Sequence, residues 1–573
     1  MNEEQEAIKS KNYDAIVIGT GISGGWAAKE LCENGLKTLV LERGRMVKHV
    51  TDYPTMYKEN WDFKHRNRLP VEEAKRQEKQ SRTGYTTAEE TRHWFVDDIE
   101  HPYSETKRFD WMRGYHVGGR SLTWGRHSYR LSEMDFEANK KDGYGVDWPI
   151  RYKDIAPWYD KVEEYIGVSG TNLGLKQLPD GKFSEPMEFN CVEADLAKRV
   201  AEKMDGRVIT HGRVAHITGD AVHEGRGKCQ FRNRCMRGCP FGGYFSSNAS
   251  TLPAAERTGN MTLRPNSIAH EIVYDEKSKK ATGVKVIDTE TKEELFYEAQ
   301  IIFCCASAIA SNAILMQSKS KRFPNGLGND SGELGHNIMD HHLGVGAYAI
   351  VDEHQDDYYI GRRPGGMYIP RFRNLDEKSK RADYIRGFGY QGAASRRNWR
   401  RGVAEMSYGE SLKDELVKPG PWVIGISGFG ECLPYHENKI SLNYDKLDQW
   451  GLPTVDFDVE FKENEKAMRK DIQEEAIAML KAAGHRKVIG FDNPNQFAPG
   501  LAIHEMGGAR MGRDPKTSIL NEYNQVHTVP NVYVTDGACM TSSGCQNPSL
   551  TYMALTARAA NHAAREFKKN SKA

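Results

Sequence analysis

The segment from Asp14 to Glu42 predicts a βαβ unit built around a glycine-rich turn. Residues 14–18 (DAIVI) form a short continuous apolar run, which is typical of a strand buried in a parallel sheet. A second run follows at residues 36–42 (LKTLVLE). Between the two, the sequence GTGISG opens a helix that we expect to reach about Cys32. This unit predicts an α/β fold with a parallel sheet near the amino terminus.

The three glycines of this turn each have a mechanical role in dinucleotide binding. Gly19 permits the tight turn, Gly21 lets the backbone approach a pyrophosphate, and Gly24 lets the helix pack close to the strand. Glu42 ends the second strand, where a carboxylate can accept a hydrogen bond from a ribose 2′-OH. Glycines that serve only a turn are the alternative. The complete unit favours a dinucleotide, without distinguishing NAD from FAD.

The middle of the chain has a different pattern. From about residue 343 to residue 459, segments such as WVIGISGFG and KISLNY alternate in polarity and are separated by Gly, Pro and Asn. They predict an antiparallel sheet in a second lobe. A helix is expected from about residue 464 to residue 483, with Gly484 as its carboxyl-terminal cap. Residues 51–110 predict a surface excursion, either a lid, an arm that binds a partner, or only a solvated face.

Three cysteines are crowded into the sequence KCQFRNRCMRGCP. Cys229, Cys235 and Cys239 have the spacing C-x5-C-x3-C, and Gly238 precedes the last of them. Closely spaced cysteines in a glycine-containing loop favour an iron–sulfur cluster. A zinc site completed by a histidine such as His223 is one alternative, and plain buried thiols are another. Four arginines surround the motif and would either stabilise an anionic cluster or simply be solvated: Arg226, Arg232, Arg234 and Arg237.

The carboxyl-terminal region carries a second set of motifs. His504 lies in GLAIHEMGGARMG, and Asn547, 43 residues later, lies in GCQNPSLTYMALT, where Pro548 follows it. This arrangement resembles the signature of the glucose-methanol-choline (GMC) family of flavin oxidoreductases. Further segments resemble that family in the same order along the chain: GYHVGGRSLTWGRHSYR at 114–130, ASAIASNAILMQS at 306–318, GHNIMDHH at 335–342 and the pair Asp536-Gly537.

The resemblance implies FAD as the cofactor and a Rossmann-like FAD-binding domain joined to a substrate domain on an antiparallel sheet. It implies that the 114–130 loop, the Asp536-Gly537 pair and the element around Asn547 contact the flavin nucleotide. The loop at 119–127 lacks the S-T-H-W pattern of covalent attachment, so we expect the FAD to be non-covalent. The flavin contacts implied in these three segments are Gly118, Gly119, Ser121, Asp536, Gly537 and Pro548.

His504 and Asn547 have distinct chemical roles in this reading. A neutral imidazole can take the proton of a substrate hydroxyl, so His504 is the predicted base. An amide takes no proton but can fix the hydroxyl and orient its C–H bond, which is the role predicted for Asn547. Asparagine at this position resembles the pyranose-oxidising branch of the family. Any single histidine is more often structural, and the spacing of the two motifs is what favours catalysis here.

The cysteines narrow the resemblance further. They are similar to those of the flavoprotein subunits of bacterial sugar dehydrogenases, glucoside 3-dehydrogenases among them, which hold a [3Fe–4S] cluster. This implies oxidation of a secondary sugar hydroxyl, with C3 as the expected position. It also implies a small partner subunit and a cytochrome c or other one-electron acceptor. The alternatives are an O₂-using pyranose or glycoside oxidase and a flavin-retaining lyase of the same fold.

The predicted domain organisation is discontinuous. The FAD-binding domain takes residues 12–50, 111–145, 190–325 and 495–570, the excursion takes 51–110, and the substrate domain takes 146–189 and 326–494. The 80 basic and 79 acidic side chains exclude a strong charge bias toward nucleic acid, and no apolar run reaches the length of a membrane span. No signal peptide is recognised at the amino terminus. A periplasmic location through a partner that bears the signal is the expectation, and a cytoplasmic location is the alternative.

Overall fold

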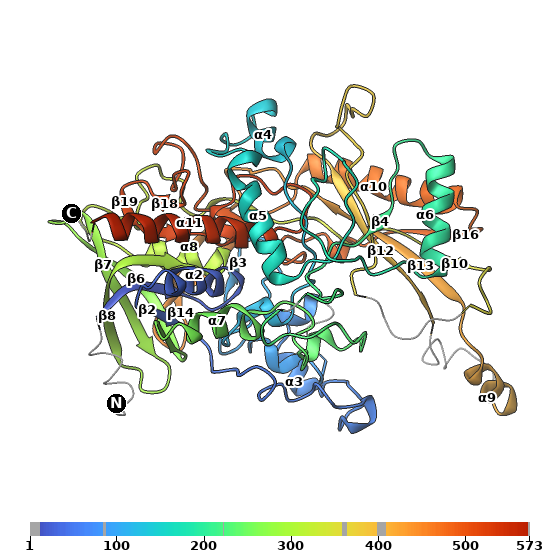
Figure 1. The fold of residues 1–573 in the computed structure, drawn as a ribbon, viewed down its shortest axis with the longest axis horizontal. Coiled ribbons are helices and arrows are strands. Elements are labelled where there is room, and N and C mark those ends of the chain that lie inside the picture. The colour runs from blue at the N-terminus through green and yellow to red at the C-terminus, as the bar shows by residue number, and fades with distance from the viewer. Residues whose placement is uncertain (1–11, 84–87, 222, 358–363, 398–407, 571–573) are drawn as a thin grey trace.

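Three β-sheets form the framework of the molecule. The structure, a computed structural model, describes residues 12–83, 88–221, 223–357, 364–397 and 408–570. Figure 1 shows the largest sheet and the antiparallel sheet in opposite halves of the molecule.

The largest sheet has eight strands and a parallel centre in the order β19-β8-β1-β2-β5. Strand β18 pairs with β19, and β7 links β6 to β8 in an antiparallel extension. Its strands are β1 (Tyr13–Ile18), β2 (Thr38–Leu41), β5 (Met261–Arg264), β6 (Ser267–Asp275), β7 (Lys280–Asp288), β8 (Glu294–Cys304), β18 (Gln525–Val526) and β19 (Val529–Val534). The predicted βαβ unit is therefore present, with α2 (Ile22–Glu33) between β1 and β2.

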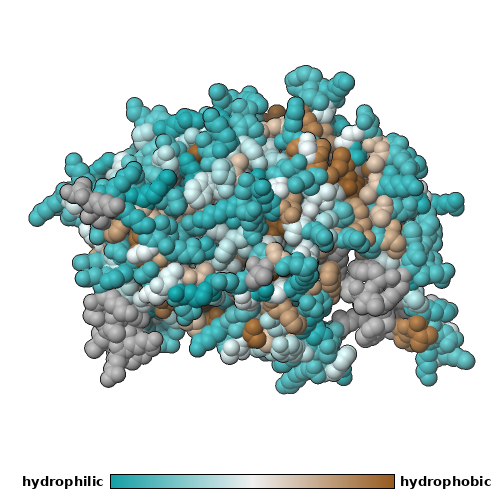
Figure 2. Space-filling model, in the orientation of Figure 1, coloured by the Kyte–Doolittle hydropathy of each residue, from teal (hydrophilic) through white to brown (hydrophobic). Residues whose placement is uncertain are grey.

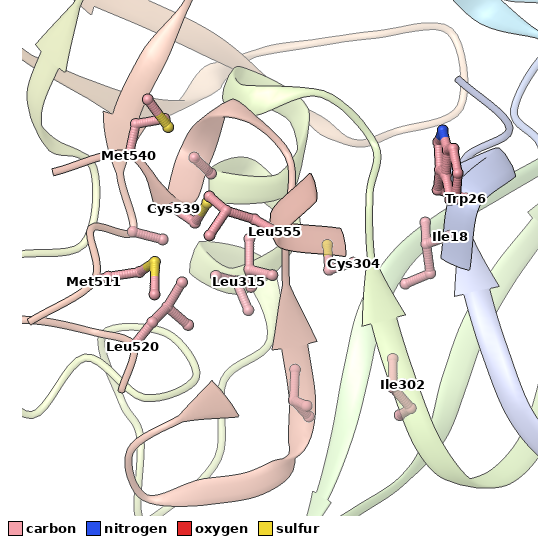
Figure 3. Close-up of a cluster of buried hydrophobic side chains, with 14 of the residues drawn as sticks. Ile18, Trp26, Ile302, Cys304, Leu315, Met511, Leu520, Cys539, Met540 and Leu555 are labelled. Carbon is pink, nitrogen blue, oxygen red and sulfur yellow. The ribbon is translucent and has the colours of Figure 1, made fainter. Parts of the chain in front are cut away.

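Both faces of this sheet are covered, as a parallel sheet requires. On one face, alanines of α2 pack against alanines of α11 (Ser549–Asn570), so that both helices approach the strands closely. The other face packs against α8 (Ala308–Gln317) and the carboxyl-terminal loops. Figure 3 shows this second cluster, in which Cys304 and Cys539 lie among aliphatic side chains. These two thiols are core residues.

The second sheet is antiparallel and contains WVIGISGFG, as predicted, whereas KISLNY lies in the third sheet. Its six strands run in the order β16-β10-β13-β12-β11-β4. They are β4 (Thr210–His211), β10 (Val345–Val351), β11 (Met367–Ile369), β12 (Phe388–Arg396), β13 (Trp422–Gly430) and β16 (Lys487–Asp492). Helix α10 (Glu463–Ala482) and helix α6 (Cys191–Lys203) pack in the cluster formed with this sheet. Gly484, with φ of +91°, follows α10 and ends it as predicted.

A third sheet is formed by strands that are distant in sequence. Its order is β17-β9-β14-β15-β3, with β3 (Ser104–Glu105), β9 (His336–Met339), β14 (Lys439–Leu447), β15 (Pro453–Asp458) and β17 (Met506–Gly508). Strands β9 and β17 pair antiparallel, with Met339 opposite Met506. This pairing places the residues just after β9 beside the residues just before β17.

The packing of two segments differs from the predicted domain boundaries. Although residues 190–325 were expected in the FAD-binding domain, α6 and β4 pack with the antiparallel sheet. Conversely, α5 (Tyr152–Ile166), expected in the substrate domain, packs in the main core with strands of the parallel sheet. Both helices place one apolar face inward. This pattern predicts that each helix packs against a sheet, but it does not predict which of the sheets.

Four further α-helices lie in the described residues. They are α3 (Val71–Arg76), α4 (Glu133–Asp142), α7 (Thr251–Arg257) and α9 (Glu410–Val417). The face drawn in Figure 2 is mostly hydrophilic, with apolar residues in small groups, and one such group lies at α9, where Val417 is exposed. Within the described ranges, no helix combines the length and the hydropathy needed to cross a bilayer.

Candidate active site

A cavity opens at the carboxyl ends of the parallel strands, the place where α/β sheets bind ligands. It is bounded by the glycine-rich turn, by the loop after residue 118, and by the turn after β19. Seven of the residues predicted to contact the cofactor line it: Gly19, Gly21, Glu42, Gly119, Ser121, Asp536 and Gly537. Segments separated by more than 400 residues in sequence therefore meet at one site.

The three other predicted cofactor residues, Gly24, Gly118 and Pro548, do not line the cavity but contact residues near it. A Cβ atom on Gly24 would lie 1.9 Å from the carbonyl oxygen of Gly19, so this glycine permits the close packing of α2 on the turn. The amide of Gly118 donates to the Thr20 hydroxyl at 2.9 Å and joins two walls of the cavity. The carbonyl of Pro548 accepts from the Tyr552 amide at 3.1 Å in the first turn of α11.

Glu42, at the end of the second strand, is held by the glycine-rich turn and by the backbone that follows it. Its carboxylate accepts hydrogen bonds from the amides of Thr20, at 3.2 Å, and Gly44, at 3.0 Å, and from the Thr20 hydroxyl. Burial raises the pKa of the Glu42 carboxyl, while these hydrogen bonds lower it. The side chain is thus oriented at the end of β2, in the lining of the cavity.

The amino terminus of α2 has the properties of an anion site. Its N-cap residue, Gly21, has no side chain to satisfy the first amides, and the first turn contains no acidic residue. Free amide groups at a helix amino terminus bind phosphate. A Cβ atom added to Gly21 would meet no protein atom within 4 Å, so no packing within the protein explains this glycine. These residues fit the pyrophosphate of a dinucleotide.

This contrast between two glycines gives a prediction. Gly21→Ala should fold as the wild type does, because its φ of −67° suits alanine and the space is open. It should nevertheless lose most of its FAD, because the methyl group occupies the approach of the pyrophosphate. FAD content after gel filtration and thermal unfolding of the apoprotein measure the two effects.

Gly24→Ala is the matched control, and it should lower the stability of the apoprotein itself, because its methyl group meets the Gly19 carbonyl. A Gly21→Ala protein that retains a full complement of FAD would show that the pyrophosphate does not approach this residue.

His504 and Asn547 meet beside this cavity. His504 precedes β17 and Asn547 precedes α11, and the Nδ2 atom of Asn547 lies 3.2 Å from Nε2 of His504. Both residues are half-buried. Burial lowers the pKa of the His504 imidazole well below its usual value, and the nearby His341 and Arg120 lower it further. The imidazole is therefore neutral at ordinary pH and can accept a proton.

Sequence analysis did not identify the residues that hold this pair. His341 Nδ1 lies 2.9 Å from His504 Nδ1, and the Gln391 amide donates to Oδ1 of Asn547. Asp340 accepts the backbone amide of His504 at 3.0 Å and so fixes the loop. Asp340 and His341 belong to the GHNIMDHH segment, which was the available signal, but Gln391 on β12 carried none.

The three predicted cysteines line one cavity of their own. Cys229, Cys235 and Cys239 are half-buried around a space also bounded by His216 and Tyr244. Burial and the two neighbouring thiols raise the pKa of Cys229 to about 11, so its thiolate would need a bound cationic group to form at neutral pH.

The spacing of these thiols bears on which group could bind. Thiolates around one zinc ion lie about 3.8 Å apart, given Zn–S bonds of about 2.3 Å in a tetrahedron. Over the described ranges, the three sulfur atoms do not all lie within 4.8 Å of one another, whereas the ligand atoms of Cys191, His354 and Asp357 do. His223, the zinc alternative, does not line the cysteine cavity. Binding of a single zinc ion by all three thiols would therefore require them to move closer together.

Three of the four arginines around the cysteines are paired with residues of the 51–110 excursion, so they are not simply solvated. Arg234 and Arg237 form ion pairs with Glu59 and Glu90, respectively. Arg232 donates to the carbonyl of Met56 at 2.7 Å. The partners of these three lie in the 51–110 excursion, whereas Arg226 donates to the carbonyls of Gly242 and Ile166. The arginines therefore attach this excursion to the cysteine loop.

The two cavities are joined by hydrogen bonds between adjacent segments. The Tyr244 hydroxyl donates to the carbonyl of Leu122 at 2.7 Å, and Nε1 of Trp124 donates to the carbonyl of Phe245 at 2.9 Å. Tyr244 lines the cysteine cavity, and Trp124 lines the dinucleotide cavity. The short segments 121–124 and 244–245 thus connect both sites.

The chain is similar to known proteins over nearly its whole length. Residues 13–343 and 434–556 match two family models, both described as GMC oxidoreductase. The chain is 27% identical to the 2-methyl-1,2-propanediol dehydrogenase of Mycolicibacterium austroafricanum, over 97% of this chain and 95% of that protein. It is 25% identical to the fructose dehydrogenase large subunit of Gluconobacter japonicus, over 96% and 97%. Its fold resembles the crystal structure of pyridoxine 4-oxidase from Mesorbium loti, with a TM-score of 0.58, 15% identity and coverage of 97% and 99%.

Proposed function

This chain belongs to the GMC oxidoreductase family, whose members act on CH–OH donors with FAD, and we propose that it is a dehydrogenase of a sugar or glycoside. The reaction is oxidation of a secondary ring hydroxyl, with C3 as the position and a 3-keto product. The observation that carries this proposal is the approach of His504 Nε2 and Asn547 Nδ2 to 3.2 Å beside the dinucleotide cavity.

The chain's own residues divide the work of this oxidation. A hydroxyl placed between the two side chains would donate its proton to Nε2 of His504, while the Asn547 amide donates to the hydroxyl oxygen. The carbon–oxygen double bond forms as the proton and a hydride leave the same carbinol group. Bound FAD supplies the hydride acceptor. Because His504 is neutral, it needs no prior deprotonation by solvent.

The sugar class is supported by the fructose dehydrogenase large subunit among the relatives, and by Asn547 at the position where the pyranose-oxidising branch has asparagine. C3 follows the resemblance of the cysteine segment to glucoside 3-dehydrogenases. A ring hydroxyl is a secondary alcohol, and the pair of one base and one amide suits it.

We also propose that Cys229, Cys235 and Cys239 hold a [3Fe–4S] cluster that passes electrons singly to an external acceptor. Three thiols around one cavity, and the short connection from Tyr244 to Leu122, support a relay between the two sites. A small subunit and a cytochrome c or similar one-electron acceptor complete the proposed system. We place this assembly in the periplasm, exported with a signal-bearing partner.

The experiment that tests the function is anaerobic reduction of the bound FAD by a panel of free sugars, glycosides and simple polyols. We expect the flavin absorbance to bleach fastest with a sugar or glycoside, and NMR of the product to show a ketone at C3. A ketone at another carbon would correct the position only. Bleaching by polyols alone would overturn the sugar assignment, and rapid turnover with O₂ would favour the oxidase alternative.

A further inference from the structure

Four side chains around the reacting position form one continuous chain of hydrogen bonds. His341 Nε2 lies 2.7 Å from the carbonyl oxygen of Gly544, and its Nδ1 lies 2.9 Å from His504 Nδ1. His504 Nε2 lies 3.2 Å from the Asn547 amide nitrogen, and the Asn547 oxygen accepts from Gln391. The chain runs from a backbone carbonyl at one end to a glutamine of the antiparallel sheet at the other.

The carbonyl of Gly544 fixes the direction of every bond in this chain. A carbonyl oxygen can only accept, so Nε2 of His341 must carry a proton. Burial lowers the pKa of the His341 imidazole to about 4, which makes it neutral and leaves its Nδ1 as an acceptor. The proton between the two histidines therefore belongs to Nδ1 of His504. A neutral His504 then has its lone pair on Nε2, facing Asn547.

We infer that His341 is a positioning residue that holds His504 in the tautomer with a free Nε2 lone pair, which is the form able to take a proton from the substrate. This inference rests on the proposed role of His504. The opposite tautomer would present an N–H group to the substrate hydroxyl and could not act as a base. A histidine alone does not select between the two forms strongly, so the selection must come from its partner.

The same contact serves the protonated state of His504. After proton transfer both ring nitrogens of His504 are donors, and Nδ1–H continues to donate to His341. This hydrogen bond therefore keeps the orientation of His504 unchanged when Nε2 takes up the proton. His341 passes no proton onward, because its other nitrogen already donates to the Gly544 carbonyl. At the far end, Gln391 keeps the Asn547 amide nitrogen turned toward His504.

Two substitutions at position 341 separate this role from simple packing. His341→Leu removes both the donor and the acceptor, whereas His341→Gln retains one of each at similar separation. His342→Leu is the matched control, because His342 is the adjacent buried histidine and neither of its ring nitrogens has a partner within the described part of the chain.

Measured by stopped flow in the FAD-loaded protein, His341→Leu should slow flavin reduction by about 10²-fold, without a matching change in sugar affinity. His341→Gln should recover most of this loss, and His342→Leu should match the wild type. Equal rates for His341→Leu and His342→Leu would overturn the inference.

A second measurement needs no substrate. In ¹⁵N-histidine-labelled wild-type protein, the ring signals lost in His504→Asn should show a proton on Nδ1 and none on Nε2. A proton on Nε2 of His504 would overturn the inference. If no CH–OH donor reduces the flavin, the proposed function fails, and this spectrum still decides the tautomer.

Discussion

Replacement of His504 by alanine should slow reduction of the flavin by the sugar by about 10²- to 10⁴-fold, the usual contribution of a positioned general base. FAD should remain bound, because His504 is absent from the residues that line the dinucleotide cavity. The rate constant of bleaching in anaerobic stopped flow and the FAD absorbance of the purified protein measure the two effects. Normal bleaching would show that another group takes the proton.

The pH dependence of this step follows from the direction of the His504 pKa. Burial lowers that pKa well below 6.5, so the imidazole is neutral above it and charged only in more acidic solution. The wild-type rate of flavin reduction should therefore be constant through neutral pH and fall only on the acid side, well below pH 6.5. A rate that rises through pH 7 would assign a higher pKa to the base.

His342→Ala is the control for His504→Ala, because it removes a buried imidazole that has no proposed role in proton transfer. His342 lies near Phe461 and Phe497 and has no ring hydrogen bond in the described residues. Its removal should lower stability while leaving the bleaching rate intact. A slow His342→Ala protein would mean that the His504 effect is not specific to its position.

The parts of the site that sequence predicts are those with contiguous signals. The turn from Gly19 to Glu42 is local, so strand, helix and carboxylate are visible together and α2 lies where expected. His504 and Asn547 are recognisable because each lies within a short motif that resembles one of the family, and the two motifs have the expected separation. These two features locate the dinucleotide cavity and the reacting position.

The site residues that the sequence does not reveal are placed by pairing between distant segments. His341 meets His504 only because β9 pairs with β17, and nothing in either segment states that register. Gln391 reaches Asn547 from the middle of β12, where a glutamine is otherwise an ordinary strand residue. Polar side chains that act through a hydrogen bond to another residue have no periodicity of their own. Sequence alone therefore yields the proposed reacting pair without the residues that hold it.

The arginines of the cysteine loop show that sequence alone also does not reveal which charged side chains are paired. Their sequence positions predict a positive field at the cysteines, yet Arg234 and Arg237 are paired with Glu59 and Glu90 more than 140 residues away. Paired charges cancel at a distance. Their effect is mechanical, since they attach the 51–110 excursion beside the cavity.

Cys235→Ser should separate the two halves of the proposed reaction. The variant should lose iron, because a serine hydroxyl replaces one of three thiols around the cavity. Flavin reduction by the sugar should proceed at the wild-type rate, since His504 and Asn547 are untouched. Turnover with cytochrome c should fall by roughly tenfold or more, while turnover with a two-electron quinone is retained.

Cys191→Ser is the matched control, because Cys191 is also half-buried but lies at the start of α6, outside the cysteine cavity. It should keep the iron content and the cytochrome c rate of the wild type. Anaerobically purified wild-type protein should contain about three irons per chain and, when oxidised, give the EPR signal of a three-iron centre. Zinc in place of iron, or full cytochrome c turnover by iron-free Cys235→Ser, would contradict the relay. Loss of the proposed cluster should interrupt electron export, because the segment 244–245 at the cysteine cavity bonds to the segment 121–124 at the dinucleotide cavity. Substrate oxidation should stay intact, because His504 and Asn547 lie outside the cysteine cavity.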